Sequence, residues 1–363
     1  MLANKNKISL RQALFILLTS VFSPAIRFIP RYTAYTAKQA AYLSPFVSFL
    51  VLYLMILLMD KNLKKHGQLS ILDTIYAIVG RFIGKILFFF YILWLLLIIS
   101  LFTRYYGDRL VTSLFPNTRM NIFIIVMFLM IFITIRFDIV ILARMNDIIL
   151  PLINIVFLFL VIFLLPKFEI KNVTPISYLD IIPIFKSSLS ISSLWGMIFF
   201  VLLIDNKINN IEKLKTQGLY VFLFLAITTS LLIAIVIGTL GYRVSLRAPL
   251  PFLAAVKLIS IFDILEKVES IVVVLWILTD FVLISILSYV IMELIKSLFD
   301  LEDEKPLAGL LLIILYFTTM FITQSKFDLE LFSTIIANPV LLIFTIIIPY
   351  IIFLFGLIKK KAT

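Results

Sequence analysis

The stretch TSVFSPAIRF, Thr19 to Phe28, lies inside the first long apolar run of the chain. It places hydroxyl side chains, a proline and an arginine in a segment otherwise made of Leu, Ile, Phe and Val. Pro24 has no N–H and its ring clashes with the preceding turn, so it leaves backbone carbonyls without helical partners. In lipid such groups need a partner from protein or ligand. The stretch therefore predicts either a simple kink or a break that lines a cavity.

The composition is that of an integral membrane protein. Of the 363 residues, 63% are hydrophobic and only 14% are charged, and the mean hydropathy is +1.16. A water-soluble core of this chain length does not bury so much apolar surface. The net charge of +12 comes from Lys and Arg placed between apolar runs, as loop anchors are, which argues against nucleic-acid binding.

Few residues are available for catalytic chemistry. The chain has no cysteine, and its single histidine, His66, lies in a polar loop. We find no nucleophile with a base and an orienting group, no glycine-rich phosphate loop and no acidic pair with a plausible partner. The sequence therefore predicts no catalytic residues, no metal site, no cofactor and a protein that is not an enzyme.

Apolar stretches of about 20 residues predict ten membrane helices in a single membrane domain, 1–363. They lie near 8–29, 41–59, 83–112, 119–136, 139–165, 184–204, 217–241, 268–298, 306–323 and 337–358. We expect the N-terminal run to be retained as the first span, because it continues past the usual apolar region of a signal peptide without a small-residue cleavage site. A weak excess of Lys and Arg in the inside loops predicts that both termini are cytoplasmic.

A second interrupted span opens the second half of the chain. The segment KSSLSISSLWG, Lys186 to Gly196, contains five serines and a glycine before a purely apolar run resumes. Paired interruptions in the first and sixth spans predict two inverted five-helix repeats, about 1–166 and 167–363, with a ligand at the broken helices. Half-helix N-termini would face a carboxylate there, and free carbonyls an ammonium or a cation. Helix packing through small residues is the alternative explanation of the serines.

Asp280 lies midway along the eighth span, in LWILTDFVLIS. A carboxylate at that depth is costly and indicates a ligand site, a partner or a proton relay. Trp276 is one turn earlier, so the two side chains share a face. The alternative is an aspartate that is protonated, or paired with an Arg or Lys, only to hold helices together. Arg27 is expected to snorkel outward, with recognition of a substrate carboxylate as its alternative role.

The candidate ligand-binding residues come from the first, sixth and eighth spans. The residues of the first and sixth spans would shape the two half-sites, and those of the eighth span would close the site. They are Thr19, Ser20, Ser23 and Pro24, then Ser190, Ser192, Ser193 and Gly196, then Trp276 and Asp280.

The segment from Leu250 to Phe299 resembles the signature region of the spore germination B-subunit permeases, the GerAB family of the amino acid–polyamine–organocation superfamily. The pattern of that region is a Pro-Phe segment, a basic-x-Glu element and then a tryptophan. Pro251-Phe252, Lys267-Val268-Glu269 and Trp276 stand at these places. Further short matches follow in order along almost the whole chain, at Gln12, Pro30, Gly80, Arg144 and Pro151.

The sequence departs from the family pattern at both helix breaks. Phe22-Ser23-Pro24 stands where the family often has glycine, and Gln39-Ala40-Ala41-Tyr42 where it has an Asp-Ala-Trp element. The sixth span ends in Leu202-Leu203-Ile204-Asp205-Asn206 instead of an apolar run with Gly-Glu. Because these changes fall near the expected site, the ligand of better-known members does not carry over.

The resemblance implies an all-α membrane protein with a LeuT-like 5+5 inverted repeat and broken helices 1 and 6. It further implies a subunit of a germinant receptor in the spore inner membrane, with an A-type membrane subunit and a C-type lipoprotein as partners. Such a subunit binds a small nutrient, here expected to be an amino acid, and signals germination. Two alternatives remain: a proton- or cation-coupled amino-acid permease with Asp280 as the carrier, and a scaffold subunit that binds no ligand.

Overall fold

The computed structural model describes residues 7–67, 69–113, 115–259, 268–323 and 325–359. Within these ranges, eight apolar helical stretches are long enough to cross a membrane. The first of them, Leu10–Lys65, contains two spans, and the shorter stretch Lys305–Phe321 adds another. The described part of the chain therefore has the ten spans that the apolar stretches predict.

Several of the connections between the spans contain short helices or single helical turns. The spans are α1 (Leu10–Ala37), α2 (Ser44–Lys65), α4 (Arg81–Ser113), α5 (Met120–Phe137), α6 (Ile139–Leu164), α7 (Ile181–Trp195) with α8 (Ile198–Leu202), α9 (Leu214–Leu240), α12 (Val268–Phe299), α13 (Ala308–Phe321) and α14 (Lys326–Phe332) with α15 (Asn338–Leu342) and α16 (Ile348–Ile358). The connecting helices are α3 (Ile71–Val79), α10 (Tyr242–Arg247) and α11 (Pro251–Val256).

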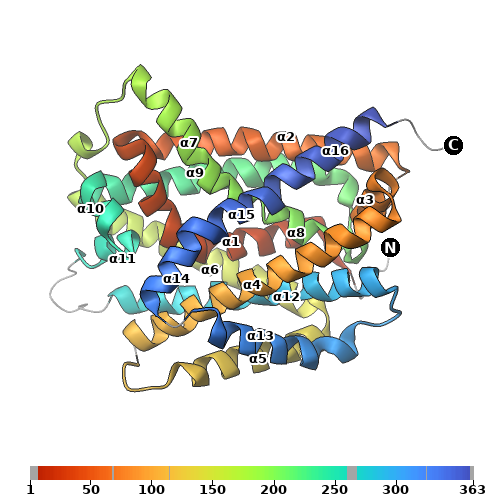
Figure 1. The fold of residues 1–363 in the computed structure, drawn as a ribbon. Helices are drawn as coiled ribbons and strands as arrows, with labels where there is room; N and C mark the ends of the chain where they lie inside the picture. The colour runs from red at the N-terminus through yellow and green to blue at the C-terminus, as the bar shows by residue number, and fades with distance from the viewer. Residues whose placement is uncertain (1–6, 68, 114, 260–267, 324, 360–363) are drawn as a thin grey trace.

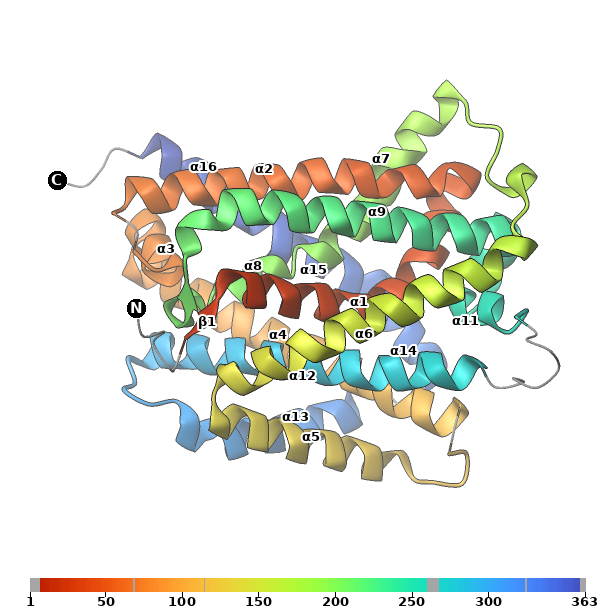
Figure 2. The same cartoon turned by 180° about the vertical axis from the view of Figure 1, so that it is seen from behind.

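The spans form a bundle with an inner and an outer set of helices. The helices α2 and α9 lie along one side, α5 and α13 along the opposite side, and α1, α8 and α12 lie between them, while the first half of α7 projects beyond α2 (Figures 1 and 2). In the most apolar segment of each span, the share of residues buried inside the protein is 72% for the α7–α8 span and for α12, but 33% for α5. The inner helices are therefore covered by protein, and the outer helices leave apolar side chains for lipid.

A short parallel strand pair joins the first span to the sixth. β1 (Ile8–Ser9) pairs with β2 (Ile208–Asn209), with Ile8 opposite Ile208 and Ser9 opposite Asn209. Ser9 also caps α1: its hydroxyl accepts from the N–H of Gln12, and the Gln12 side chain accepts from the N–H of Ser9. The strand pair, which the apolar pattern does not predict, ties the start of α1 to the residues that follow α8.

The first span bends without unwinding. α1 is one continuous helix from Leu10 to Ala37 although it contains Pro24 and Pro30, and its ribbon changes direction along its length (Figure 1). The Ser20 hydroxyl donates to the carbonyl of Ile16 (2.7 Å) in the same helix. The expected break in helix 1 is therefore instead a bend, because each proline removes one backbone donor while the rest of the hydrogen-bond ladder continues.

Candidate functional site

The sixth span is broken as the sequence predicts. α7 ends at Trp195, Gly196 and Met197 form a turn, and α8 begins at Ile198. A Cβ atom on Gly196 would lie 2.5 Å from Oγ1 and 2.7 Å from Cβ of Thr345 in the last span. Glycine is therefore needed because the last span approaches the backbone of the break more closely than a side chain allows.

A charged cluster lies between α1, α4 and α12, formed by Ser23, Arg109, Trp276 and Asp280. The Nη2 of Arg109 pairs with the carboxylate of Asp280, and its Nη1 donates to the Ser23 hydroxyl (3.0 Å). The guanidinium carbon lies 5.0 Å from the ring centroid of Trp276. The structure thus brings together three predicted residues around an arginine that the prediction did not include.

The contact with Arg109 bears on the two explanations of Asp280, a structural ion pair or a functional site. An arginine beside the aspartate is what a purely structural pair requires, and the two side chains are 6% and 2% exposed. In membrane proteins, a carboxylate at such a depth is also a group at which a charged ligand or a proton can act. The signal for Arg109 in the sequence was an arginine within an apolar span, in FTRYYGDRLV.

A second group, the serine–asparagine cluster, joins α7 to the last span through Ser190, Ser193, Asn338 and Thr345. The Ser193 hydroxyl donates to Oδ1 of Asn338 (2.8 Å), and Nδ2 of Asn338 donates to the Ser190 hydroxyl (3.4 Å). The Thr345 hydroxyl donates to the carbonyl of Ser193 (3.0 Å). Sequence reasoning missed Asn338 and Thr345, although the polar residues in STIIANPVLLIFT mark them in an apolar span.

The last span carries π-helical turns on both sides of this contact. They run over Ser333–Ala337 and Ile343–Ile347 and flank α15. A π-helical turn shifts the face that the following residues present, and such turns are frequent at functional sites. Asn338 and Thr345 are seven positions apart on this span, and both contact α7.

Two predicted residues, Thr19 and Ser192, have buried hydroxyls with no partner among the described residues. Ser192 lies one turn after Ser188, whose carbonyl accepts a hydrogen bond from Ser48 of α2 (2.9 Å). That face of α7 therefore packs on α2, as the small-residue explanation of the serines requires.

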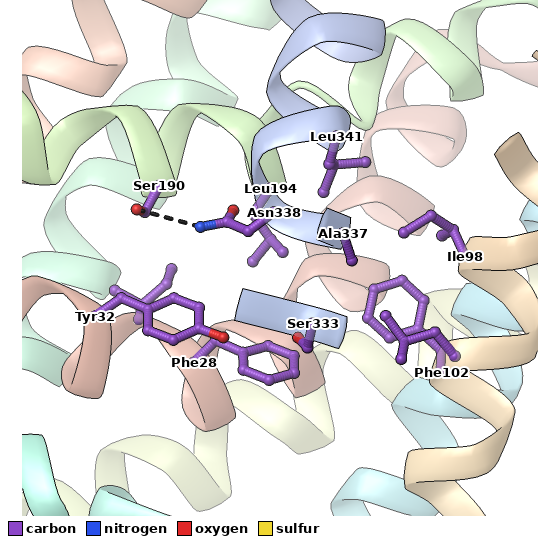
Figure 3. Close-up of a pocket in the computed structure, with 12 residues that line it drawn as sticks. Phe28, Tyr32, Ile98, Phe102, Ser190, Leu194, Ser333, Ala337, Asn338 and Leu341 are labelled. Carbon is purple, nitrogen blue, oxygen red and sulfur yellow. Dashed lines mark hydrogen bonds between the residues drawn. The ribbon is translucent and has the colours of Figure 1, made fainter. Parts of the chain in front are cut away.

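A pocket lies between α1, α4, α7 and the last span (Figure 3). Its volume is about 30 Å³, room for one or two water molecules. Of the predicted site residues, Ser190 lines it. The lining residues are Phe28, Ile29, Tyr32, Ile98, Leu101, Phe102, Ser190, Leu194, Ser333, Ala337, Asn338 and Leu341. The pocket is thus mainly apolar, with hydroxyl and amide groups as its polar contacts.

Charged residues link α1 to α14 beside this pocket. Arg27 pairs with Oε1 of Glu330 (3.0 Å) and Arg31 with Oε2 (3.1 Å). The Arg27 guanidinium carbon also lies 3.2 Å from the ring centroid of Tyr105. Arg27 is only 4% exposed, so the expectation that it snorkels outward is wrong: the half-buried carboxylate of Glu330 and the aromatic face of Tyr105 hold it inside the bundle.

The fold and these two clusters define a class of membrane protein. The structure matches a crystal structure of MhsT in complex with L-phenylalanine with a TM-score of 0.63, over 98% of this chain and 99% of that chain, at 12% sequence identity. The chain is therefore a multi-pass membrane protein with the LeuT-like transporter fold, which confirms the expected fold class.

The family follows from the sequence. Residues 7–328 match the spore permease family, which is described as "Spore germination protein". Spore germination protein B2 of Bacillus subtilis (strain 168) is 20% identical over 367 residues, covering 99% of this chain and 97% of that protein. The chain belongs to the spore germination permease family, as the resemblance at Trp276 and the preceding motif indicated. Lys267 of that motif lies outside the described residues.

Proposed function

We propose that this protein is the permease-like membrane subunit of a spore germinant receptor, which binds a small nutrient and signals germination. The observation that carries the proposal is the pocket where the bent first span, the broken sixth span and the last span meet. Its apolar walls and few hydroxyl and amide groups suit an amino acid with an apolar side chain. L-phenylalanine in the similarly folded MhsT supports an amino acid as the ligand class.

The predicted site residues take different roles in this proposal. Ser190 contacts the ligand, whereas Ser193 and Gly196 set the position of α7 against the last span. The charged cluster of Ser23, Trp276 and Asp280 holds α1 and α12 in one arrangement around Arg109. The remaining predicted residues shape the helices: Pro24 bends α1, Ser20 bonds within it, and Thr19 and Ser192 allow close packing.

The size of the pocket supports a signalling mechanism. At about 30 Å³ the pocket is too small for an amino acid, so binding requires α1, α7 and the last span to move apart. A ligand that binds the wider arrangement better shifts the population toward it. Partner subunits that contact the outer helices would then detect the change.

The proposal includes partners and a location. We propose an A-type membrane subunit and a C-type lipoprotein as partners in the inner membrane of the spore, with both termini in the cytoplasm. Lys65 supports the common side of the termini, because its Nζ donates to the carbonyls of Gly356, Leu357 and Lys359 at the end of the last span. The helix α14, which leads into the lining residues Ser333 and Ala337, lies in the half of the bundle away from the termini (Figure 1), so the pocket would face arriving nutrients.

A coupled amino-acid permease is the second candidate, favoured by the LeuT-like fold and by the buried ion pair of Asp280. The experiment that separates the two is germination of spores that lack the gene, followed as loss of refractility with single amino acids and sugars. The receptor proposal expects the response to one nutrient to disappear while the others persist. Unchanged germination together with lost uptake in growing cells would identify a permease instead.

A further inference from the structure

Arg27 has hydrogen-bonding capacity that the protein does not use. Its side chain is 5% exposed, and only Nη2 has a partner, the Oε1 atom of Glu330. The Nε and Nη1 atoms are buried and have no hydrogen-bond partner among the described residues. Buried polar groups of native proteins are normally hydrogen-bonded, and a guanidinium is among the costliest groups to leave incomplete.

The aromatic neighbours of Arg27 do not remove this deficit. The guanidinium carbon lies 3.2 Å from the ring centroid of Tyr105 and 5.0 Å from that of Phe28. Rings contact the flat face of a guanidinium, whereas its N–H groups point outward in the plane. The free N–H groups of Nε and Nη1 therefore point outward on two different edges of the guanidinium, where each can donate to a carboxylate oxygen.

Arg27 lies at the border of the pocket. Phe28, the next residue of α1, lines the pocket, and its ring contacts the ring of Tyr105 (5.4 Å). Glu330 is one turn before Ser333, which also lines the pocket and lies beside Phe28 in Figure 3. A ligand that widens the pocket at this end therefore meets the guanidinium of Arg27.

The balance of charge at this end favours an anion. Arg109 is neutralised by Asp280. Glu330 divides its two oxygens between Arg27 and Arg31, so it neutralises no more than one of these two arginines. One positive charge remains, and the pocket lining contains no carboxylate that would need a cationic partner.

We propose that Arg27 recognises the carboxylate of the ligand, which replaces or joins Glu330 on the guanidinium. The ligand class is then a small carboxylate with an apolar body, and the ammonium of an amino acid meets only neutral hydroxyl and amide oxygens. The carboxylate is required, and the ammonium contributes little. This assignment rests on the proposed function, because it names the chemistry of the same pocket.

The first test compares matched compounds on spores that carry the wild-type gene. Each set contains one amino acid (alanine, valine, leucine or phenylalanine), the amine that lacks its carboxylate and the acid that lacks its ammonium. The concentration that gives half-maximal germination is measured for every compound. We expect the active amino acid to lose at least about tenfold in potency as the amine, and much less as the acid. An amine as potent as its amino acid overturns the role of Arg27 but leaves the receptor intact. A gene deletion that changes no response overturns both proposals.

Variants then separate recognition from a structural role. Arg27→Gln should raise the half-maximal concentration at least about tenfold, and Arg27→Lys should recover part of the loss because it keeps the charge but not the paired donors. Glu330→Gln should not weaken the response, because it removes the residue that competes with the ligand. If Arg27 only pairs with Glu330, both glutamine variants weaken the response equally, which overturns the proposal.

The matched control is Arg243→Gln at the same end of the bundle. Arg243 of α10 is exposed, and its Nε donates to the hydroxyl of its neighbour Tyr242 (3.2 Å). Its removal changes the net charge as Arg27→Gln does, but away from the pocket. Protein levels in the spore membrane are measured for every variant. A loss of potency in the control equal to that in Arg27→Gln would assign the effect to overall charge and contradict the proposal.

Discussion

Arg109 of α4 and Asp280 of α12 form an ion pair inside the bundle, with side chains only 6% and 2% exposed. They are 171 positions apart in the chain. Because neither charge has water to solvate it, each depends on the other. The pair therefore fixes the relative position of α4 and α12, and Ser23 adds α1 to the same contact.

Removal of one charge of the Arg109–Asp280 pair should lower the free energy of unfolding more than removal of both charges. We expect Asp280→Asn to lower the free energy of unfolding by about 3–5 kcal/mol, because Arg109 is left as an uncompensated buried charge. The double variant Arg109→Gln with Asp280→Asn should regain most of that loss. Thermal unfolding of the full chain in mild detergent measures both. Equal losses in the single and double variants would contradict the argument, and an intact ligand response and complex assembly in Asp280→Asn would remove Asp280 from the proposed site.

Gly196→Ala should disturb the break in the sixth span. The added Cβ would lie 2.5 Å from the Thr345 hydroxyl, so α7 and the last span must move apart, at a cost of about 1–3 kcal/mol. Gly218→Ala in α9 is the control, because its added Cβ would lie 3.4 Å from Ile56, an ordinary contact. We expect the control to be neutral or stabilising by up to about 1 kcal/mol, because alanine favours helix over glycine. Similar unfolding temperatures for both variants would refute the role of the close approach.

Asn338 and Ser193 should be energetically coupled. Asn338→Ala removes the acceptor of the Ser193 hydroxyl, but that hydroxyl also donates to the carbonyl of Ser190 in its own helix (2.9 Å). The loss should therefore be only about 1 kcal/mol. A double-mutant cycle with Ser193→Ala measures the coupling as the difference between the double variant and the sum of the single ones. Strictly additive losses would show that the hydrogen bond does not join α7 to the last span.

The stability of the protein should fall as the pH rises through neutrality. Asp205 lies between β2 and α8, outside the spans, and burial raises the pKa of its carboxyl from 3.8 to about 7; the nearby charges of Asp73 and Glu293 act in the same direction. Its Oδ2 accepts from the N–H of Ile71 (2.8 Å). The folded chain holds this proton more tightly than the unfolded chain does. The contribution to stability is therefore complete below the unfolded pKa and is lost as the pH rises through the folded one.

Unfolding temperatures measured at about pH 6 and about pH 8 test this linkage. We expect the wild-type chain to be less stable at the higher pH and Asp205→Asn to lose this difference, because the amide keeps an acceptor for Ile71 and does not ionise. Asp300→Asn is the control. Hydrogen bonds from Lys85 and Arg81 hold the pKa of Asp300 below its ordinary value, so it is ionised at both pH values. A pH difference that survives in Asp205→Asn would place its origin elsewhere.

The apolar pattern of the sequence is sufficient to predict which segments cross the membrane and which of their polar groups need partners. A span of apolar residues needs no tertiary information, because each helix satisfies its own backbone in lipid. The break at Gly196 and the need of Asp280 for a partner were also predictable, because a serine-rich interruption and a lone carboxylate are costly in an apolar span. The bend at Pro24 was predictable as an alternative to a break, since one proline removes one donor.

The identity of the partners depends on how the helices pack together. It paired Asp280 with Arg109, placed Glu330 on Arg27 across 303 positions of the chain, and set Asn338 against Ser193 across 145 positions. It also divided the single predicted site into the charged cluster and the serine–asparagine cluster. The physical reason is that a buried polar group must find a partner, but its own sequence neighbourhood does not specify which distant helix supplies it. The packing of the bundle makes that choice.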